Sequence, residues 1–346
     1  GGLVRDAAGN TVAATVFDGL SLSNAGEIVI DTTEPTVTVD VVDTQLNNTD
    51  AMSAVTFTFS EVPVGFTEGD ISVTNGSLVA GTFALDGTDA TGKTYKAVVQ
   101  AADDFAGNVL VGVAASKFTD AAGNANASVA SDTVASDRAN PTVSGIVYGS
   151  NDGKLSDGES ITFEVSFSEI VVVGTGGDAP SLALNNGGTA SYASGSNSST
   201  LVFTYTTSSG EDVADLALAS SSALSGVITD LQGNAVVASG FDDVNPAGTV
   251  LVDVIAPSAP TINVVATDDV VNADENSNLV ISGTGEVDAI VTLSNTNQND
   301  TVDSNGDWSI TVSDAATAFS QGSETLSVSQ TDVAGNTSST SVSSIT

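Results

Sequence analysis

The sequence contains no cysteine and no histidine among its 346 residues. Without cysteine the chain has no disulfide bonds and no thiol nucleophile. Without histidine it lacks a Ser-His-Asp triad, and the absence of both residues excludes ordinary zinc and copper sites. Paired acids such as Asp268 and Asp269 are adjacent, so in a strand they would point to opposite faces, which is poor geometry for acid–base catalysis. We therefore expect no enzyme activity and no catalytic residues.

Basic residues are also scarce, with 6 Lys+Arg against 43 Asp+Glu and a formal net charge of −37. Such a chain has no basic patch that could neutralise phosphates, which excludes nucleic acid as a partner and argues against anionic membrane surfaces. No apolar run approaches the roughly 18 residues of a membrane-spanning helix, so membrane insertion is not expected. The excess of acids has two interpretations: a solvated surface typical of salt-adapted proteins, or carboxylates neutralised by bound cations.

Aromatic residues make up only 5% of the sequence, yet several fall in strand-like alternating runs. One run places Val55, Phe57 and Phe59 on the same face, and residues 160–168 repeat the pattern. Many short runs of this kind, separated by Gly, Asn and Asp, are typical of a β-sandwich. Further strands are expected over residues 36–42, 71–74, 77–85, 95–101, 109–118, 200–206, 279–283, 289–294, 308–312 and 324–330. Residues 213–222 could form one short helix.

A turn sequence of the form Asp-x-x-Gly-Asn recurs along the chain. Full copies begin at Asp6, Asp120, Asp230 and Asp332, and a looser copy begins at Asp104. The full copies recur at intervals of about 100 residues, which is the length of one small immunoglobulin-like sandwich. The pattern predicts a hairpin turn in which the Asp side chain caps the turn and Gly takes a positive φ. Whether the Asp carboxylate is also a metal ligand is left open by the pattern alone.

The repeat predicts an all-β fold of tandem immunoglobulin-like β-sandwich domains in a linear array. Complete domains are expected at 36–140, 141–257 and 258–346. Residues 1–35 align with 226–257 and are expected to be the C-terminal part of such a domain, or a strand-donating segment. Each copy of the motif except the last leads to an Asp and then a Pro, which indicates a final strand followed by a short stiff linker.

Several phrases of the sequence resemble bacterial immunoglobulin-like repeats of large secreted adhesins. They are VTFTFSEVPVGFTEGDISVTNGSL with FTDAAGN, ITFEVSFSEIVVV with GTASYASGSNSSTLVFTYT, and SGTGEVDAIVTLS with DSNGDWSITV and TDVAGNTS. The resemblance implies extracellular domains in long arrays, exported by a type I system of the RTX kind and stiffened by Ca²⁺ at domain junctions. It therefore implies a non-catalytic structural extender of an adhesin on the bacterial cell surface, whose partners are the neighbouring domains of the same array.

In a sandwich of this topology the F–G hairpin lies at the end where the chain enters, while the A–B and E–F loops lie at the opposite end. Acidic residues of consecutive domains should therefore converge at each junction, where Ca²⁺ requires six to eight oxygen ligands. The candidate ligands are Asp31, Asp120 and Asn124 at the first junction; Asp43, Asp50, Asp103, Asp104, Asp132, Asp137, Asp230 and Asn234 at the second; and Asp152, Asp157, Glu159, Asp253, Asp332 and Asn336 at the third. At the second junction Asp132 and Asp137 are expected to lie in the linker.

Two other functions fit the sequence. In the first, the chain is a self-assembling extracellular filament or surface-layer subunit, in which residues 1–35 complete the sheet of a like subunit by strand addition. In the second, it is a carbohydrate- or protein-binding adhesin module, for which residues 141–257 are the best candidate because of their long Gly/Ser/Asn loops. Sugar sites commonly use exposed aromatic rings, and only Tyr192 is available in those loops.

Overall fold

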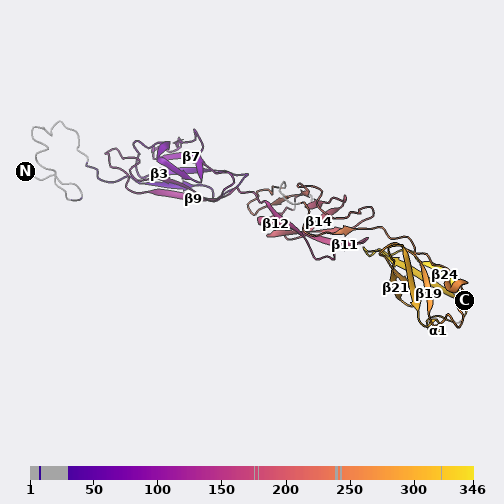
Figure 1. The fold of residues 1–346 in the computed structure, drawn as a ribbon. Coiled ribbons are helices and arrows are strands. Elements are labelled where there is room, and N and C mark those ends of the chain that lie inside the picture. The colour runs from indigo at the N-terminus through magenta and orange to yellow at the C-terminus, as the bar shows by residue number, and fades with distance from the viewer. Residues whose placement is uncertain are drawn as a thin grey trace, which may run out of the picture. The chain divides into compact units, whose positions relative to one another are not determined.

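The computed structural model describes residue 8 and residues 30–174, 176–177, 179–237, 241, 244–320 and 322–346 (Figure 1). These residues belong to two compact units. The first runs to Ala139 and includes Gln232–Asn234, and the second comprises Asn140–Leu231 and Ala235–Thr346. Apart from residues 8 and 30–35, the segment 1–35 lies outside the described residues, and so does the first Asp-x-x-Gly-Asn copy at Asp6. The strand-donating role of this segment stays a prediction.

The first unit contains a sandwich of two sheets. One sheet has the order β1 (Val37–Val41), β3 (Met52–Phe59), β7 (Thr94–Ala101) and β5 (Gly76–Leu78), with β6 (Ala84–Leu85) also pairing with β7. The other has the order β2 (Gln45–Leu46), β9 (Ala130–Asp137), β8 (Ala106–Val113) and β4 (Ile71–Thr74), preceded by the 3₁₀ turn η2 (Glu68–Asp70). Figure 1 labels β3 and β7 of one sheet and β9 of the other.

Alternation in β3 builds the core of this sandwich. Val55, Phe57 and Phe59 are buried, as the period-two pattern predicts. The ring of Phe59 meets those of Phe66 and Phe118 edge to face, each at a centroid distance of 4.8 Å. Phe118 lies two residues before Asp120, so this aromatic cluster anchors the start of the turn motif.

The second unit begins with a larger sandwich. Its main sheet has the order β10 (Val143–Tyr148), β12 (Ser160–Val173), β15 (Ser198–Thr206), β14 (Thr189–Ser194), β13 (Ser181–Ala183) and β16 (Leu224–Ser225), and β17 (Ile228–Thr229) also pairs with β12. A short parallel pair joins β11 (Lys154–Leu155) to β18 (Leu251–Val252). Ile161, Phe163, Val165 and Phe167 of β12 are all buried, which confirms the predicted face.

The rest of the second unit is a smaller sandwich. Its strands are β19 (Leu279–Thr284) paired with β22 (Asp307–Val312), and a four-stranded sheet in the order β21 (Gln298–Thr301), β20 (Ile290–Leu293), β23 (Glu324–Thr331) and β24 (Ser341–Ile345). Two short helical turns accompany them, η3 (Val265–Thr267) and α1 (Ala315–Ala318). Trp308 is 2% exposed in its core, and its indole N–H donates to the Thr284 carbonyl.

Strands account for 44% of the structure and helices for 3%, which confirms the all-β prediction. Three separate clusters of buried apolar side chains lie within residues 37–134, 146–252 and 265–345. The helix expected over 213–222 is wrong, because the N–H groups of Leu216 and Leu218 donate to carbonyls of residues 250 and 244 instead of forming helical bonds. Among the described residues, no helix combines the length and the apolar character needed to cross a bilayer.

Candidate metal centre and linker contacts

The motif Asp120–Asn124 lies in the connection between β8 and β9, which is the F–G hairpin of the first sandwich. The turn is closed by the Asp120 N–H, which donates to the Asn124 carbonyl at 3.1 Å, and by the Gly123 N–H, which donates to the Asp120 carbonyl. Gly123 has φ +94°, a region that L side chains rarely adopt. Gly233 and Gly335 repeat this conformation with φ +89° and +105°. The predicted turn therefore forms in all three described copies.

The Asp120 carboxylate is buried, with 2% of the residue exposed. Its Oδ1 accepts the Asn124 N–H at 2.8 Å, and its Oδ2 accepts the Asn124 side-chain amide at 2.7 Å. Burial raises the pKa of Asp120, but these bonds and those from the backbone N–H groups of residues 122–124 outweigh it, so the pKa lies below its ordinary value. Asp332 makes the same two bonds to Asn336, each at 2.9 Å.

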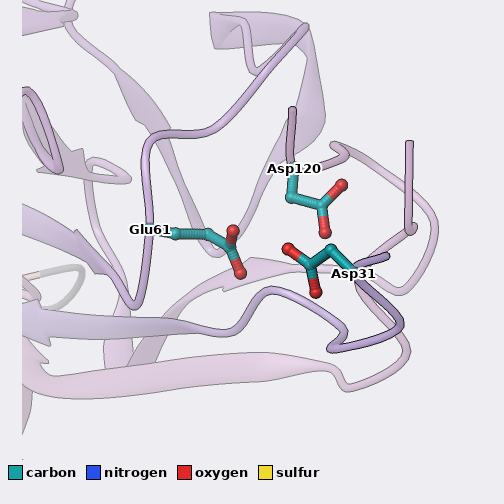
Figure 2. Close-up of side chains that lie close together, drawn as sticks. All are labelled: Asp31, Glu61 and Asp120. Atoms are coloured by element: carbon teal, nitrogen blue, oxygen red, sulfur yellow. The ribbon is translucent and has the colours of Figure 1, made fainter. Parts of the chain in front are cut away.

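Two further carboxylates face Asp120. Asp31 comes from the chain that leads into β1, and Glu61 comes from the loop that follows β3. Asp31 and Glu61 are half-buried, and one carboxylate oxygen from each of the three residues lies within 4.8 Å of the others. Figure 2 shows the three carboxyl groups turned toward one another. The group thus joins the linker, a strand end and the motif hairpin.

The chemistry of this donor set fits a hard divalent cation. Three carboxylates offer up to six oxygens, and an oxygen that accepts one hydrogen bond keeps a second lone pair. At a separation of about 4 Å each pair of like charges repels by roughly 1 kcal/mol in water, and by more in a half-buried setting. The ion pairs formed by the described residues involve Asp70, Asp86 and Asp103, so no basic side chain of that part of the chain neutralises the three carboxylates of this group. Asp31, Glu61 and Asp120 would therefore hold an ion such as Ca²⁺, which prefers oxygen ligands.

A related pair of acids occurs in the second unit. Glu169 follows the β12 core run as Glu61 follows β3, and its carboxylate lies within 4.8 Å of that of Asp230. In both sandwiches a glutamate just beyond the buried run of β3 or β12 therefore lies beside the motif aspartate. Glu61 and Glu169 were not among the predicted ligands, although the same dipeptide, Ser-Glu, ends both core runs.

The motif asparagines fasten each hairpin to the preceding linker. The side-chain amide of Asn124 donates to the backbone carbonyl of Asp31 at 3.1 Å, and that of Asn336 donates to the carbonyl of Asp253 at 2.8 Å. Within the first unit, the amide of Asn234 donates to the carbonyl of Asp137 at 2.9 Å. The role of the asparagine is thus to bind a main-chain carbonyl of the linker.

The other predicted ligands have separate surroundings. Asp132 lies within β9 and not in a linker as expected, and its Oδ2 accepts the Val41 N–H at 2.8 Å, which ties β9 to β1. Asp103 forms an ion pair with Arg138 at 2.6 Å. Among the described residues, the following belong to no group of three carboxylates within 4.8 Å: Asp43, Asp50, Asp103, Asp104, Asp132, Asp152, Asp157, Glu159, Asp253 and Asp332.

Several of these acids instead accept backbone hydrogen bonds. Glu159 accepts the Ser156 N–H at 2.9 Å, Asp152 accepts the Lys154 N–H at 3.3 Å, and Asp253 accepts the Ile255 N–H at 3.1 Å. Such bonds are typical of turn-capping acids. At these three positions the acid therefore caps a turn of the backbone.

Tyr192 does not provide a flat exposed ring. It is half-buried, its ring meets that of Phe203 edge to face at 6.1 Å, and its hydroxyl accepts the Ser196 N–H at 3.0 Å. An aromatic residue held in this way is a poor platform for stacking on a sugar.

In the first sandwich one sheet has the strand order A–B–E–D and the other the order A′–G–F–C, and the motif hairpin connects strands F and G of the second sheet. This topology defines an immunoglobulin-like sandwich. Residues 31–136 match the family model described as a bacterial Ig-like domain, and residues 256–345 match one described as a bacterial Ig domain. These two segments are bacterial immunoglobulin-like domains. No curated protein matches the sequence.

Three solved structures are among those that match this chain at low identity. FdeC, an Escherichia coli adhesin, is 13% identical over 90% of this chain and 96% of its own, with a TM-score of 0.34. Invasin, a bacterial integrin-binding protein, is 14% identical over 89% of this chain and 58% of its own, with a TM-score of 0.32. The surface layer protein SbsC is 13% identical over 90% of this chain and 48% of its own, with a TM-score of 0.23. Similarity at this level carries no argument about function.

Proposed function

We propose that the chain is a non-catalytic structural extender of a bacterial cell-surface adhesin, and that Ca²⁺ stiffens the attachment of its linkers. The observation that carries the proposal is the group formed by Asp31, Glu61 and Asp120. Extended arrays of bacterial Ig-like domains and a strongly acidic surface without basic patches suit an extracellular stalk.

A cation held by these three residues would act on the linker. Asp31 belongs to the linker, whereas Glu61 and Asp120 belong to the body of the sandwich. Without a cation the three charges repel one another and favour a linker that swings away. With Ca²⁺ bound, the same charges become ligands and hold Asp31 against the hairpin, in addition to the bond from Asn124 to the Asp31 carbonyl.

Calorimetry of the full chain tests this function. We expect Ca²⁺ added after chelation to raise the melting temperature of the transition that belongs to residues 31–136, because an ion that binds only the folded state stabilises it by about 2.7 kcal/mol at 100 times its Kd. Mg²⁺ should have a smaller effect, since it demands six near-octahedral ligands and gives up water reluctantly. Identical melting and scattering profiles with chelator and with Ca²⁺ would remove the calcium part of the proposal.

A further inference from the structure

The second unit contains one motif hairpin resting on a loop of the larger sandwich. Asn336 Oδ1 accepts the Asp157 N–H at 3.0 Å, while its amide donates to the Asp253 carbonyl at 2.8 Å. Gly335 lies beside Ser156, since a β-carbon built on Gly335 would be 3.8 Å from the Ser156 side chain. The loop 155–159 and the end of β18 together receive the hairpin.

Four hydrogen bonds define the receiving loop. The Leu251 N–H donates to the Gly153 carbonyl at 2.9 Å, and the Asp253 N–H donates to the Leu155 carbonyl at 3.0 Å. Glu159 Oε2 accepts the Ser156 N–H at 2.9 Å, and the Glu159 N–H donates back to the Ser156 carbonyl at 3.3 Å. The Asp157 N–H is left pointing outward, where Asn336 meets it.

The loop 269–275 of the smaller sandwich repeats three of these four bonds, and the fourth differs in that the Val271 N–H is the donor to the end of the last strand, whereas Leu155 accepts through its carbonyl. The Thr346 N–H donates to the Asp269 carbonyl and the Val271 N–H donates to the Thr346 carbonyl, both at 2.9 Å. Glu275 Oε2 accepts the Asn272 N–H at 3.1 Å, and the Glu275 N–H donates to the Asn272 carbonyl at 3.2 Å. The bonds place Val271, Asn272 and Glu275 in the positions of Leu155, Ser156 and Glu159.

Ala273 therefore takes the position of Asp157. It is exposed, and among the described residues its N–H donates to no protein acceptor. Beside it the surface is hollowed by a cavity of about 320 Å³, lined by Val271, Asn272, Ala315, Phe319 and Thr346. An outward N–H at this position of the loop is what meets Asn336 in the larger sandwich.

We propose that the loop 271–275 and the adjoining end of β24 are a docking surface for an Asp-x-x-Gly-Asn hairpin of another Ig-like domain. The Ala273 N–H donates to the side-chain oxygen of the hairpin asparagine, and the hairpin glycine lies over Asn272. The partner is identified by the hairpins of this chain, since each described copy uses its asparagine to bind a linker carbonyl. The proposal shares with the proposed function the serial arrangement of domains, and it does not require calcium.

Disulfide trapping tests the surface, because the chain has no cysteine of its own. Residues 252–346 are repeated after Thr346, and Asn272→Cys in the original copy is combined with Gly335→Cys in the added copy. The calibrating pair is Ser156→Cys with Gly335→Cys in the unextended chain, where the β-carbons would be 3.8 Å apart, within the range that a disulfide spans. The unextended chain has one tryptophan, so a second buried-tryptophan contribution to the fluorescence of the extended chain verifies that the added copy is folded.

We expect the test pair to cross-link at a rate within about threefold of the calibrating pair, and Asn336→Ala in the added copy to slow it by about tenfold. An exposed control pair, Asn299→Cys with the same Gly335→Cys, should not cross-link. The proposal is overturned if the calibrating pair forms and the test pair does not, or if neither forms. Cross-linking that persists in chelator while Ca²⁺ leaves melting unchanged would refute the calcium function alone.

Discussion

The side-chain amide of Asn336 donates a 2.8 Å hydrogen bond to the backbone carbonyl of Asp253. The same amide group also donates to Asp332, so the hairpin holds the asparagine rigidly while the asparagine holds the linker. The contact thus joins the motif hairpin to the linker through protein atoms alone.

Removal of this asparagine should loosen the smaller sandwich from its linker. Asn336→Ala leaves the Asp253 carbonyl and the Asp157 N–H without their partner, and we expect a loss of about 1–3 kcal/mol in the free energy of unfolding. The fluorescence of Trp308, the only tryptophan, reports this sandwich directly. Asn299→Ala, at an exposed strand position, is the matched control and should change stability by less than about 0.5 kcal/mol. Equal effects of the two substitutions would contradict the role of Asn336.

The Asp120 carboxyl should remain ionised at unusually low pH. Its pKa is depressed in the folded state, so its contribution to stability is present above the pKa of the unfolded chain and is lost as pH falls through the folded pKa. Carbon-detected NMR titration should give a midpoint below the ordinary value of about 3.9. Asn124→Ala removes the side-chain amide that donates to Asp120 Oδ2 but keeps the backbone N–H that donates to Oδ1, and it should move the midpoint upward. A midpoint at or above the ordinary value in the intact chain is the contrary result.

Adjacent residues of β19 should differ sharply in their contribution to stability. Ile281 is fully buried, whereas Val280 points outward and is 49% exposed. Ile281→Ala should cost about 2–5 kcal/mol, because it removes apolar atoms and leaves a cavity. Val280→Ala should cost less than about 1 kcal/mol. Urea denaturation followed by Trp308 fluorescence measures both, and similar costs would mean that the strand register is wrong.

Arg138 and Asp103 form an ion pair whose two members should contribute unequally. Arg138 is 8% exposed and also donates to the Ala101 carbonyl at 2.6 Å, whereas the Asp103 side chain is 82% exposed. Arg138→Ala should destabilise the first sandwich by about 1–3 kcal/mol, because a buried carbonyl loses its donor. Asp103→Asn should cost less than about 1 kcal/mol, as for other exposed ion pairs. Calorimetry of the two variants measures both losses of stability, and a larger loss in Asp103→Asn than in Arg138→Ala would contradict this expectation.

Local patterns in the sequence were sufficient to predict much of the fold. Alternation predicted the buried face of β3 and β12, and the spacing of Gly with Asn predicted the hairpin that closes at Gly123. These features depend on residues close together in the chain. The expected strand over 77–85 is instead split into β5 and β6, and Gly81, with φ +78°, lies in the break.

The composition of the candidate site was only partly predictable. Asp31 and Asp120 were expected, but Glu61 was missed because its position depends on the loop after β3 reaching the hairpin end. Asp132 was expected in a linker because the sequence does not show where β9 ends, and the strand continues to Asp137. Asp103 meets Arg138 through folding of the chain after β9, a contact between residues that no local pattern relates.

Calcium titration calorimetry of the intact chain and of Glu61→Gln tests the central claim most directly. Glu61→Gln keeps the shape of the side chain but removes one of the three charges, so we expect the affinity of the strongest site to fall by about tenfold or more. Glu68→Gln, at an exposed position in η2, is the matched control and should bind Ca²⁺ as the unaltered chain does. Calcium binding that is absent from the intact chain, or that is unchanged in Glu61→Gln, would contradict the account.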